Sequence, residues 1–195
     1  MFNAIERELL RNNINIEERK VLKLKEYWDL LLLHQRALHL FSRKDPNKEL
    51  ARQFYDIILL NVFLPEYEEL IDAGSGAGFA GVILAILNEQ RDYTLVERSE
   101  KRGNFLELVA VKLNLNNVRI FKGSIEIFES DADVVVSKAS CMRKLLEKRL
   151  INLVKVGGIL VHFTAVPLPS PYKNFPFFNP FREKEAYLSV VERVI

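Results

Sequence analysis

Two acidic residues and four glycines lie close together in the sequence and could bind a nucleoside. The segment ELIDAGSGAGFAG covers residues 69–81, and in it Asp72 follows two apolar residues and precedes Gly74, Gly76, Gly78 and Gly81. A glycine turn between a strand and a helix lets the backbone approach a ligand closely. The helix that follows offers free N–H groups and the positive end of its dipole. We therefore predict that a ligand lies against this turn.

The second acidic residue, Glu97, ends the strand-like run DYTLVE at positions 92–97. It lies about twenty residues past the glycines, the spacing at which an acid binds ribose hydroxyls in nucleotide-binding α/β folds. This spacing indicates a ribose without identifying the cofactor. Taken singly, Asp72 could equally be a helix cap or a turn residue, and Glu97 could be an exposed strand end.

Two ligand classes use such a turn. Residues 76–81 form a literal G-x-G-x-x-G, which is typical of dinucleotide sites. In such a site the carboxylate of Asp72 would repel the pyrophosphate, whereas it suits the ammonium and sulfonium of S-adenosylmethionine (SAM). We favour SAM. An NAD(P)-dependent oxidoreductase is the alternative, although the chain has no Y-x-x-x-K hydride-site motif beside this turn.

The elements that must position these residues alternate between strands and helices. Helical spacing or capping signals predict helices within 1–20 and over 21–41, 48–63, 79–88, 99–115 and 141–153. Apolar runs predict strands beginning at Glu69 and over 92–97, 118–121, 133–137 and 159–163, with a final antiparallel strand over 186–195. This order requires an α/β fold with a doubly wound, mostly parallel sheet and the ligand at the carboxyl ends of its strands. Residues 167–180 hold five of the seven prolines and are predicted to be a loop without regular structure.

Length and composition limit the classes of protein. With 195 residues, the chain suits an N-terminal helical extension (1–64) packed on a single compact core (65–195). The single cysteine, Cys141, excludes an internal disulfide, and the three histidines lack metal-ligand spacing, so no metal site is expected. We find no signal peptide or membrane anchor, and we expect a cytoplasmic protein without a membrane partner.

A net charge of only +2 does not suit a general nucleic-acid binder, so any RNA contact must come from a local patch. One basic segment, which contains the single acid Glu147, could supply such a patch. The simpler interpretation is that these side chains form the solvated face of a helix. The cations of this segment are Lys138, Arg143, Lys144, Lys148, Arg149 and Lys155.

From Leu30 to Phe163 the chain resembles the RsmG (GidB) family, the bacterial guanine-N7 methyltransferases of small-subunit rRNA. The segment 71–81 looks like the family's D-x-G-[ST]-G-A-G-[FL]-P-G, with Ala80 in place of proline. Glu97, followed by KR at 101–102 and FL at 105–106, is similar to the family's next series, and IE at 125–126 falls where the family has A-E beside the adenine. Ser-Lys-Ala at 137–139 stands where the family has S-R-A, and Asp45-Pro46, Arg52 and Asp56 resemble R-D-P followed by R-H-x-x-D-S.

The chain departs from the family at several positions. Gln53, Ile57 and Lys138 replace the usual histidine, serine and arginine, and after the fifth strand Thr164 to Val166 replaces the usual K-G pair. Lysine keeps the charge of arginine but loses its bidentate fork. These differences concern the RNA side of the site more than the cofactor side.

The resemblance implies a class I SAM-dependent methyltransferase with a Rossmann-like, seven-stranded sheet, acting on 16S rRNA within the small ribosomal subunit as a monomer. Lys138 is the candidate for positioning the base or a phosphate, and no residue is assigned as a certain catalyst. The expected cofactor contacts are Asp72, Gly74, Gly76, Gly78, Phe79, Glu97, Ile125, Glu126 and Lys138. The expected RNA contacts are Arg52, Asp56, Lys138, Arg143 and Lys144.

The motifs for other methyl transfers are missing where they would be needed. Exocyclic-amine enzymes carry an N/D-P-P-Y/F string after the fourth strand, where this chain has Ser-Lys-Ala, and Asn179-Pro180-Phe181 is only a partial match in a loop. Cytosine-C5 chemistry needs a nucleophilic cysteine, whereas Cys141 reads as a buried helix residue. Guanine N7 has no proton to lose, so positioning without a general base suffices. A binding module that has lost activity is a further alternative, given Gln53 and Lys138.

Overall fold

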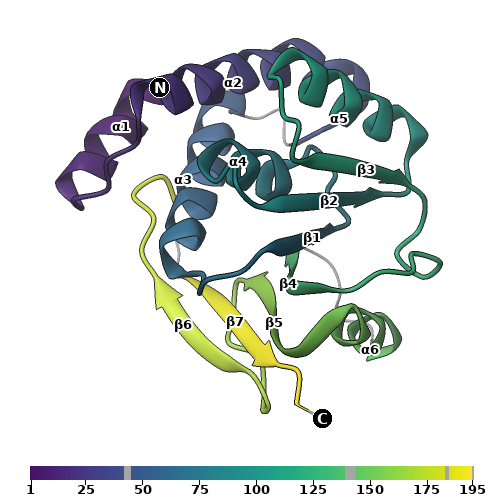
Figure 1. Cartoon of the computed structure of the whole chain (residues 1–195). Helices are drawn as coiled ribbons and strands as arrows, with labels where there is room; N and C mark the ends of the chain where they lie inside the picture. Colours follow the sequence, from purple (N-terminus) through teal and green to yellow (C-terminus); the bar gives the residue numbers. More distant parts are fainter. Residues whose placement is uncertain (42–44, 139–143, 183–184, 195) are drawn as a thin grey trace.

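A seven-stranded sheet organises the computed structural model, which describes residues 1–41, 45–138, 144–182 and 185–194. The strand order is β3-β2-β1-β4-β5-β7-β6, and helices cover the sheet (Figure 1). The strands are β1 (Glu69–Ala73), β2 (Asp92–Glu97), β3 (Val118–Lys122), β4 (Ala132–Lys138), β5 (Val154–Thr164), β6 (Lys173–Phe177) and β7 (Ala186–Glu192). The helices are α1 (Phe2–Arg11), α2 (Glu18–Leu38), α3 (Pro46–Phe63), α4 (Phe79–Leu87), α5 (Glu100–Lys112) and α6 (Lys144–Asn152).

Strand β1 lies in the middle of the sheet and pairs in parallel with both β2 and β4. Parallel pairing extends to β3 on one side and β5 on the other, and β7 then runs antiparallel between β5 and β6. The predicted mostly parallel sheet and the antiparallel last strand are confirmed. The strand order reverses between β1 and β4, and in open α/β sheets this switch point is where ligands bind.

The alternation of side chains along the central strands divides the interior into two cores. Leu70, Val134 and Val136 pack with the helices α2 to α5, whereas their neighbours Ile71 and Val135 face the opposite core. That second core includes Leu150 and Leu153, in α6 and just after it. Strands buried on both faces read as continuous apolar runs, which is why β1 and β4 were recognisable in the sequence.

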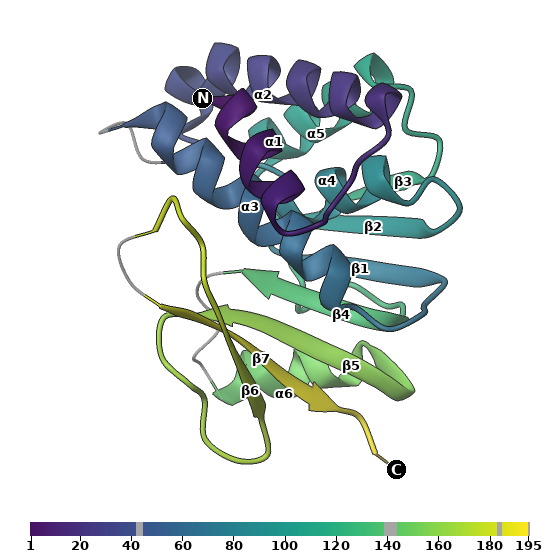
Figure 2. The same ribbon diagram turned by 90° about the vertical axis from the view of Figure 1, so that its left-hand side faces the viewer.

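The N-terminal helices belong to the larger core. Asp45 caps α3 by accepting a hydrogen bond from the Lys48 backbone N–H at 3.0 Å, and Pro46 occupies the first turn. Tyr27 of α2 and Phe54 of α3 are fully buried, with their ring centres 5.6 Å apart. Figure 2 shows α1, α2 and α3 lying over the α4 side of the sheet.

Some sequence-based expectations are corrected. Residues 173–177 form β6 rather than loop, because this strand lies at the outer edge of the sheet, where a proline such as Pro176 is tolerated. Strand β5 begins at Val154, five residues earlier than predicted, and runs through two glycines. The spacing also led us to expect Ser99 to cap α5, but its side chain makes no capping hydrogen bond. The predicted start of α6 at Cys141 lies outside the described residues.

In the part of the chain that the structure describes, no helix is both long and apolar enough to cross a bilayer. Within the same ranges, histidine, cysteine, aspartate and glutamate side chains form no group of three or more that could hold a metal ion.

Candidate functional site

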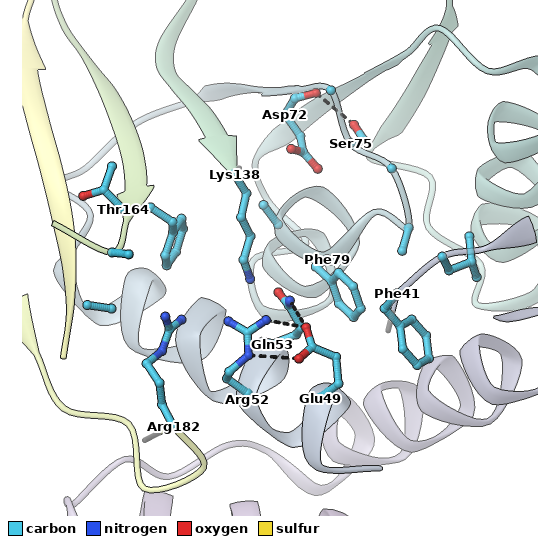
Figure 3. A pocket seen from close by; sticks show the side chains of 18 residues that line it. Phe41, Glu49, Arg52, Gln53, Asp72, Ser75, Phe79, Lys138, Thr164 and Arg182 are labelled. Carbon is cyan, nitrogen blue, oxygen red and sulfur yellow. Dashed lines mark hydrogen bonds and ion pairs between the residues drawn. The ribbon is translucent and has the colours of Figure 1, made fainter. Parts of the chain in front are cut away.

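The glycine turn after β1 separates two cavities at the carboxyl ends of the parallel strands. Gly74 lines both of them. The first cavity, of about 360 Å³, is bordered by α3, the turn, and the ends of β4 and β5 (Figure 3). The second, of about 770 Å³, lies over the ends of β2 and β3 and against α6. A ligand that passes over Gly74 would therefore occupy both.

Three glycines of the turn have backbone conformations that other residues rarely adopt. Gly74, Gly76 and Gly78 have φ values of 76°, 60° and 86°. A side chain on Gly74 would meet nothing within 4 Å, so the space over this residue is open to a ligand. The turn is also held from the N-terminal helices, because the Tyr27 hydroxyl donates to the Ala77 carbonyl at 2.7 Å.

Asp72 ends β1 beside the first cavity and is almost fully buried. Its Oδ2 accepts a hydrogen bond from the Gly81 backbone N–H, in the first turn of α4, at 2.9 Å. Burial raises the pKa of this carboxyl to about 6, although the Gly81 N–H opposes the rise. Asp72 therefore stabilises the start of α4 and also borders the cavity, so the two readings of this residue are compatible.

Glu97 ends β2 beside the second cavity and is only 4% exposed, so it is not a solvated strand end. Its Oε2 accepts from the Gly76 N–H at 2.8 Å and its Oε1 accepts from the Ser99 N–H at 2.7 Å. The carboxylate thus joins the glycine turn to the start of α5.

Ile125 and Glu126 line the same second cavity as Glu97. Arg149 of α6 fixes the loop that carries them. Its Nε donates to the Ile125 carbonyl at 3.2 Å, and its Nη2 donates to the Phe128 carbonyl.

Lys138 extends from the end of β4 into the first cavity. Its Nζ lies 5.6 Å from the ring centre of Phe79 and 5.0 Å from that of Phe163, and it has no hydrogen-bond partner among the residues that the structure describes. Burial lowers the pKa of this amine to about 8; Asp56 opposes that effect, while Arg52 and Arg182 add to it.

Asp56 is fully buried beneath the cavity and gathers its cations. Its Oδ2 lies 3.9 Å from Lys138 Nζ and 3.7 Å from Arg52 Nη1, and it accepts a hydrogen bond from Arg182 Nη2. Its Oδ1 accepts from Asn179 Nδ2 at 2.7 Å. The structure thus places Asp56 behind the cations instead of on a surface that RNA could touch.

Gln53 and Glu49 complete the α3 wall of the first cavity. Gln53 Nε2 donates to Glu49 Oε1 at 2.5 Å, and within the described ranges the buried Oε1 of Gln53 has no hydrogen-bond partner. Glu49 also pairs with Arg52, through Nε at 3.1 Å and through Nη2. The helix α3 therefore forms a wall of the site and does more than cover the sheet.

The remaining expected site residues lie elsewhere. Gly78 borders neither cavity, and a Cβ there would lie 2.5 Å from Leu106 Cδ2, so its role is in packing α4 against α5. Arg143 lies outside the described residues, as does the side chain of Lys144.

The described cations of the basic segment do not form one patch. Lys155 pairs with Glu69 at 2.6 Å and with Asp133 at 3.1 Å, near the amino ends of β1 and β4 and therefore away from the site. Arg149 is engaged with loop carbonyls, which leaves Lys148 as the exposed cation among the described side chains of α6.

The sequence analysis missed four residues at the site: Arg182, Asn179, Glu49 and Phe41. All but Asn179 line the first cavity. Asn179 and Arg182 follow the edge strand β6 in a segment without periodicity, so no pattern in the sequence could bring them to α3. Glu49 lies one turn before Arg52 on α3, and this helical spacing was the available signal.

The strand order, the glycine turn and the acid at the end of β2 define a class I SAM-dependent methyltransferase. A model of the GidB family, described as rRNA small subunit methyltransferase G, matches residues 20–167, and the chain belongs to this family. It is therefore an enzyme that uses SAM as its methyl donor. The resemblance found in the sequence is confirmed, and the nicotinamide alternative is dropped.

Relatives support the same assignment. The chain is 32% identical over 171 residues to ribosomal RNA small subunit methyltransferase G of Oenococcus oeni, covering 83% of this chain and 71% of the relative. It is 38% identical over 150 residues to the protein of that name from Fusobacterium nucleatum, covering 74% and 65%. Among solved structures, coclaurine N-methyltransferase bound to N-methylheliamine and SAH superposes with a TM-score of 0.55 at 16% identity, covering 83% of this chain and 56% of that one. This last likeness concerns the fold alone.

Proposed function

We propose that this protein methylates N7 of a guanine in 16S rRNA, as it is displayed on the small ribosomal subunit, and that it acts as a cytoplasmic monomer. The observation that carries the proposal is the glycine turn with one open cavity on each side, bordered by Asp72 on one and by Glu97 on the other. The family and its relatives support rRNA as the substrate.

The residues fit the methyl donor. In this proposal Glu97 accepts hydrogen bonds from the ribose, and Ile125 and Glu126 border the adenine. Asp72 faces the ammonium of the amino-acid end, and the open space over Gly74 and Gly76 admits the backbone contact between the two ends. Phe79 borders the first cavity and completes the donor side, and Lys138, whose Nζ lies 5.6 Å from the centre of the Phe79 ring, borders both the donor and the acceptor.

When bound, SAM supplies a methyl group on a sulfonium, and guanine N7 has a lone pair to accept it and no proton to lose. The protein then needs no general base. Its residues hold the base in line with the methyl carbon and tolerate positive charge as it moves to the base. Lys138 and Arg52 are the positioning residues on the acceptor side, and Asp56 acts through them. Arg143 and Lys144 are proposed as further RNA contacts from the sequence alone.

Labelled SAM and small ribosomal subunits from cells lacking this protein test the function. We expect label in one guanine of 16S rRNA, recovered as N7-methylguanosine by nucleoside mass spectrometry. The Gly74→Ala variant, which fills the space over the turn, serves as the matched control and should transfer little label. Label in another nucleoside would contradict the proposal. A protein that binds SAM but transfers no label to subunits or to free rRNA would also contradict it, and this result would favour an inactive binding module.

A further inference from the structure

Arg182 reaches the first cavity from a segment outside the part of the chain that matches the family model, which ends at residue 167. Asn179 ties this segment to α3. Its Nδ2 donates to the Arg52 carbonyl at 3.0 Å and to Asp56 at 2.7 Å, and its Oδ1 accepts from the Phe181 N–H at 2.8 Å. Because Asn179 is buried and has these three bonds, the backbone leading to Arg182 is fixed before any substrate binds.

The charges around Arg182 do not balance. Three cations, Arg52, Lys138 and Arg182, meet the single carboxylate of Asp56, and Glu49 pairs with Arg52. Counting only the residues that the structure describes, one positive charge is in excess in this half of the cavity. Among those residues the remaining carboxylate that lines the cavity, Asp72, lies at the opposite side, beside the glycine turn (Figure 3). A buried excess cation favours an anionic ligand.

Two nitrogens in this half also lack acceptors. Lys138 Nζ and Arg182 Nε are both buried, and neither has a hydrogen-bond partner among the described residues. Buried donors without acceptors are costly, and a charge-assisted bond to an oxyanion is the strongest way to satisfy them. Arg182 projects from the side of the cavity away from Asp72 and Ser75, so its ligand belongs to the acceptor and not to the methyl donor (Figure 3).

We infer that Arg182, together with Lys138, binds a phosphate oxygen of the target nucleotide. Arg182 is thus a substrate-binding residue contributed by the C-terminal segment, and Asp56 and Asn179 are the residues that position it. This inference rests on the proposed function, because it requires an RNA substrate in the first cavity.

The salt dependence of RNA binding tests this assignment. Affinity for the rRNA substrate is measured between 50 and 200 mM KCl for the wild type, Arg182→Gln and Arg182→Lys. The slope of log K against log salt is negative, and loss of one phosphate contact makes it shallower by about 0.7 to 0.9. We expect this shallower slope for Arg182→Gln, and a slope near that of the wild type for Arg182→Lys, because lysine keeps the charge.

Two controls separate binding from folding. Lys173→Gln removes an exposed cation from β6, beyond the first cavity, and should leave the slope unchanged. SAM affinity, measured by calorimetry, should be unchanged in all variants.

An unchanged slope in Arg182→Gln, while the wild type methylates the RNA, would overturn the assignment of Arg182 alone. Weaker SAM binding with an unchanged slope would also overturn it, because it would assign Arg182 to the donor carboxylate. A wild-type protein that neither binds nor methylates rRNA would overturn the proposed function as well.

Discussion

Asp72 carries a pH dependence that follows from its burial. Its carboxyl has a pKa of about 6 in the folded protein, against about 3.9 in an unfolded chain. The folded state therefore binds the proton more tightly than the unfolded chain does. The stabilising contribution of this group to the free energy of unfolding is fully present below pH ~4 and is lost as pH rises through ~6. The loss is on the order of 3 kcal/mol.

We predict that Asp72→Asn removes this dependence. Asparagine still accepts from the Gly81 N–H but does not titrate, so the difference in unfolding free energy between the variant and the wild type should grow in favour of the variant from pH 4 to pH 7. Urea denaturation at several pH values measures it. A difference that stays constant across this range would contradict the assignment of the raised pKa to Asp72.

Lys138 gives a second prediction, on activity. Its pKa of about 8 means that the amine loses its charge at moderately alkaline pH. If the charge positions the substrate, kcat/KM should fall as pH rises above about 8 in the wild type. In Lys138→Arg, whose guanidinium stays protonated, the alkaline fall should disappear. Rates of methyl transfer between pH 7 and 9.5 test this, and parallel profiles for the two proteins would refute it.

Within the turn between β1 and α4, two glycines serve different purposes. A Cβ on Gly74 meets no atom, whereas a Cβ on Gly78 meets Leu106 Cδ2 at 2.5 Å and Val82 Cγ2 at 2.9 Å. Both residues have positive φ, which costs an alanine roughly 1–2 kcal/mol. We predict that Gly78→Ala lowers the free energy of unfolding by roughly 1–3 kcal/mol more than Gly74→Ala does, because the added methyl group overpacks the contact with Leu106 and Val82.

Ligand binding should show the opposite order. Gly74→Ala should weaken SAM binding strongly at a small cost in stability, because Gly74 lines both cavities. Gly78→Ala should keep SAM affinity in the fraction that remains folded. Chemical denaturation and calorimetry on the two variants measure both quantities, and equal losses of stability would argue against the packing role of Gly78.

The elements differ in how far their sequence determines them. Strands β1 and β4 were predictable because burial on both faces selects continuous apolar runs, and the glycine turn was predictable because few residues adopt its backbone. Strand β6 was missed because it lies in a proline-rich segment, and the sequence does not show that this segment becomes an edge strand, where a proline is tolerated. Arg182 and Asn179 could not be assigned to the site because their bonds to Arg52 and Asp56 join residues 123 to 127 positions apart. These bonds leave no local signal, so the burial of Asp56 could not be read from its place on a helix.

At the scale of the whole molecule, we propose that residues 1–64 and 65–195 are two parts of the sequence but a single folding unit. Tyr27, Leu31 and Phe54 are completely buried in the same core as Leu70 and Val134 of the sheet. Removing these helices would expose α4, whose residues are all buried, because α2 and α3 pack against it. Burial of each large apolar side chain contributes about 1.5–3 kcal/mol, and a domain has only about 5–15 kcal/mol of net stability.

We therefore predict that the fragment 65–195 does not fold cooperatively. Its thermal or urea transition, followed by circular dichroism, should be broad or absent, while the full chain unfolds in one step. A variant lacking only residues 1–17 is the milder control and should fold with reduced stability, because it loses Ile5 and Leu9 but keeps α2 and α3. A sharp transition in the fragment 65–195 would show that the core folds alone.

The two hydrogen bonds that hold Glu97 have a further consequence. Each of its oxygens already accepts from a backbone N–H, from Gly76 on one side and Ser99 on the other, so the orientation of the carboxylate is fixed by the scaffold. In the proposed function this carboxylate binds the ribose, and little entropy would be lost in ordering it when the nucleoside binds. A shortened carboxylate at this position would then release the turn and α5 as well as the sugar.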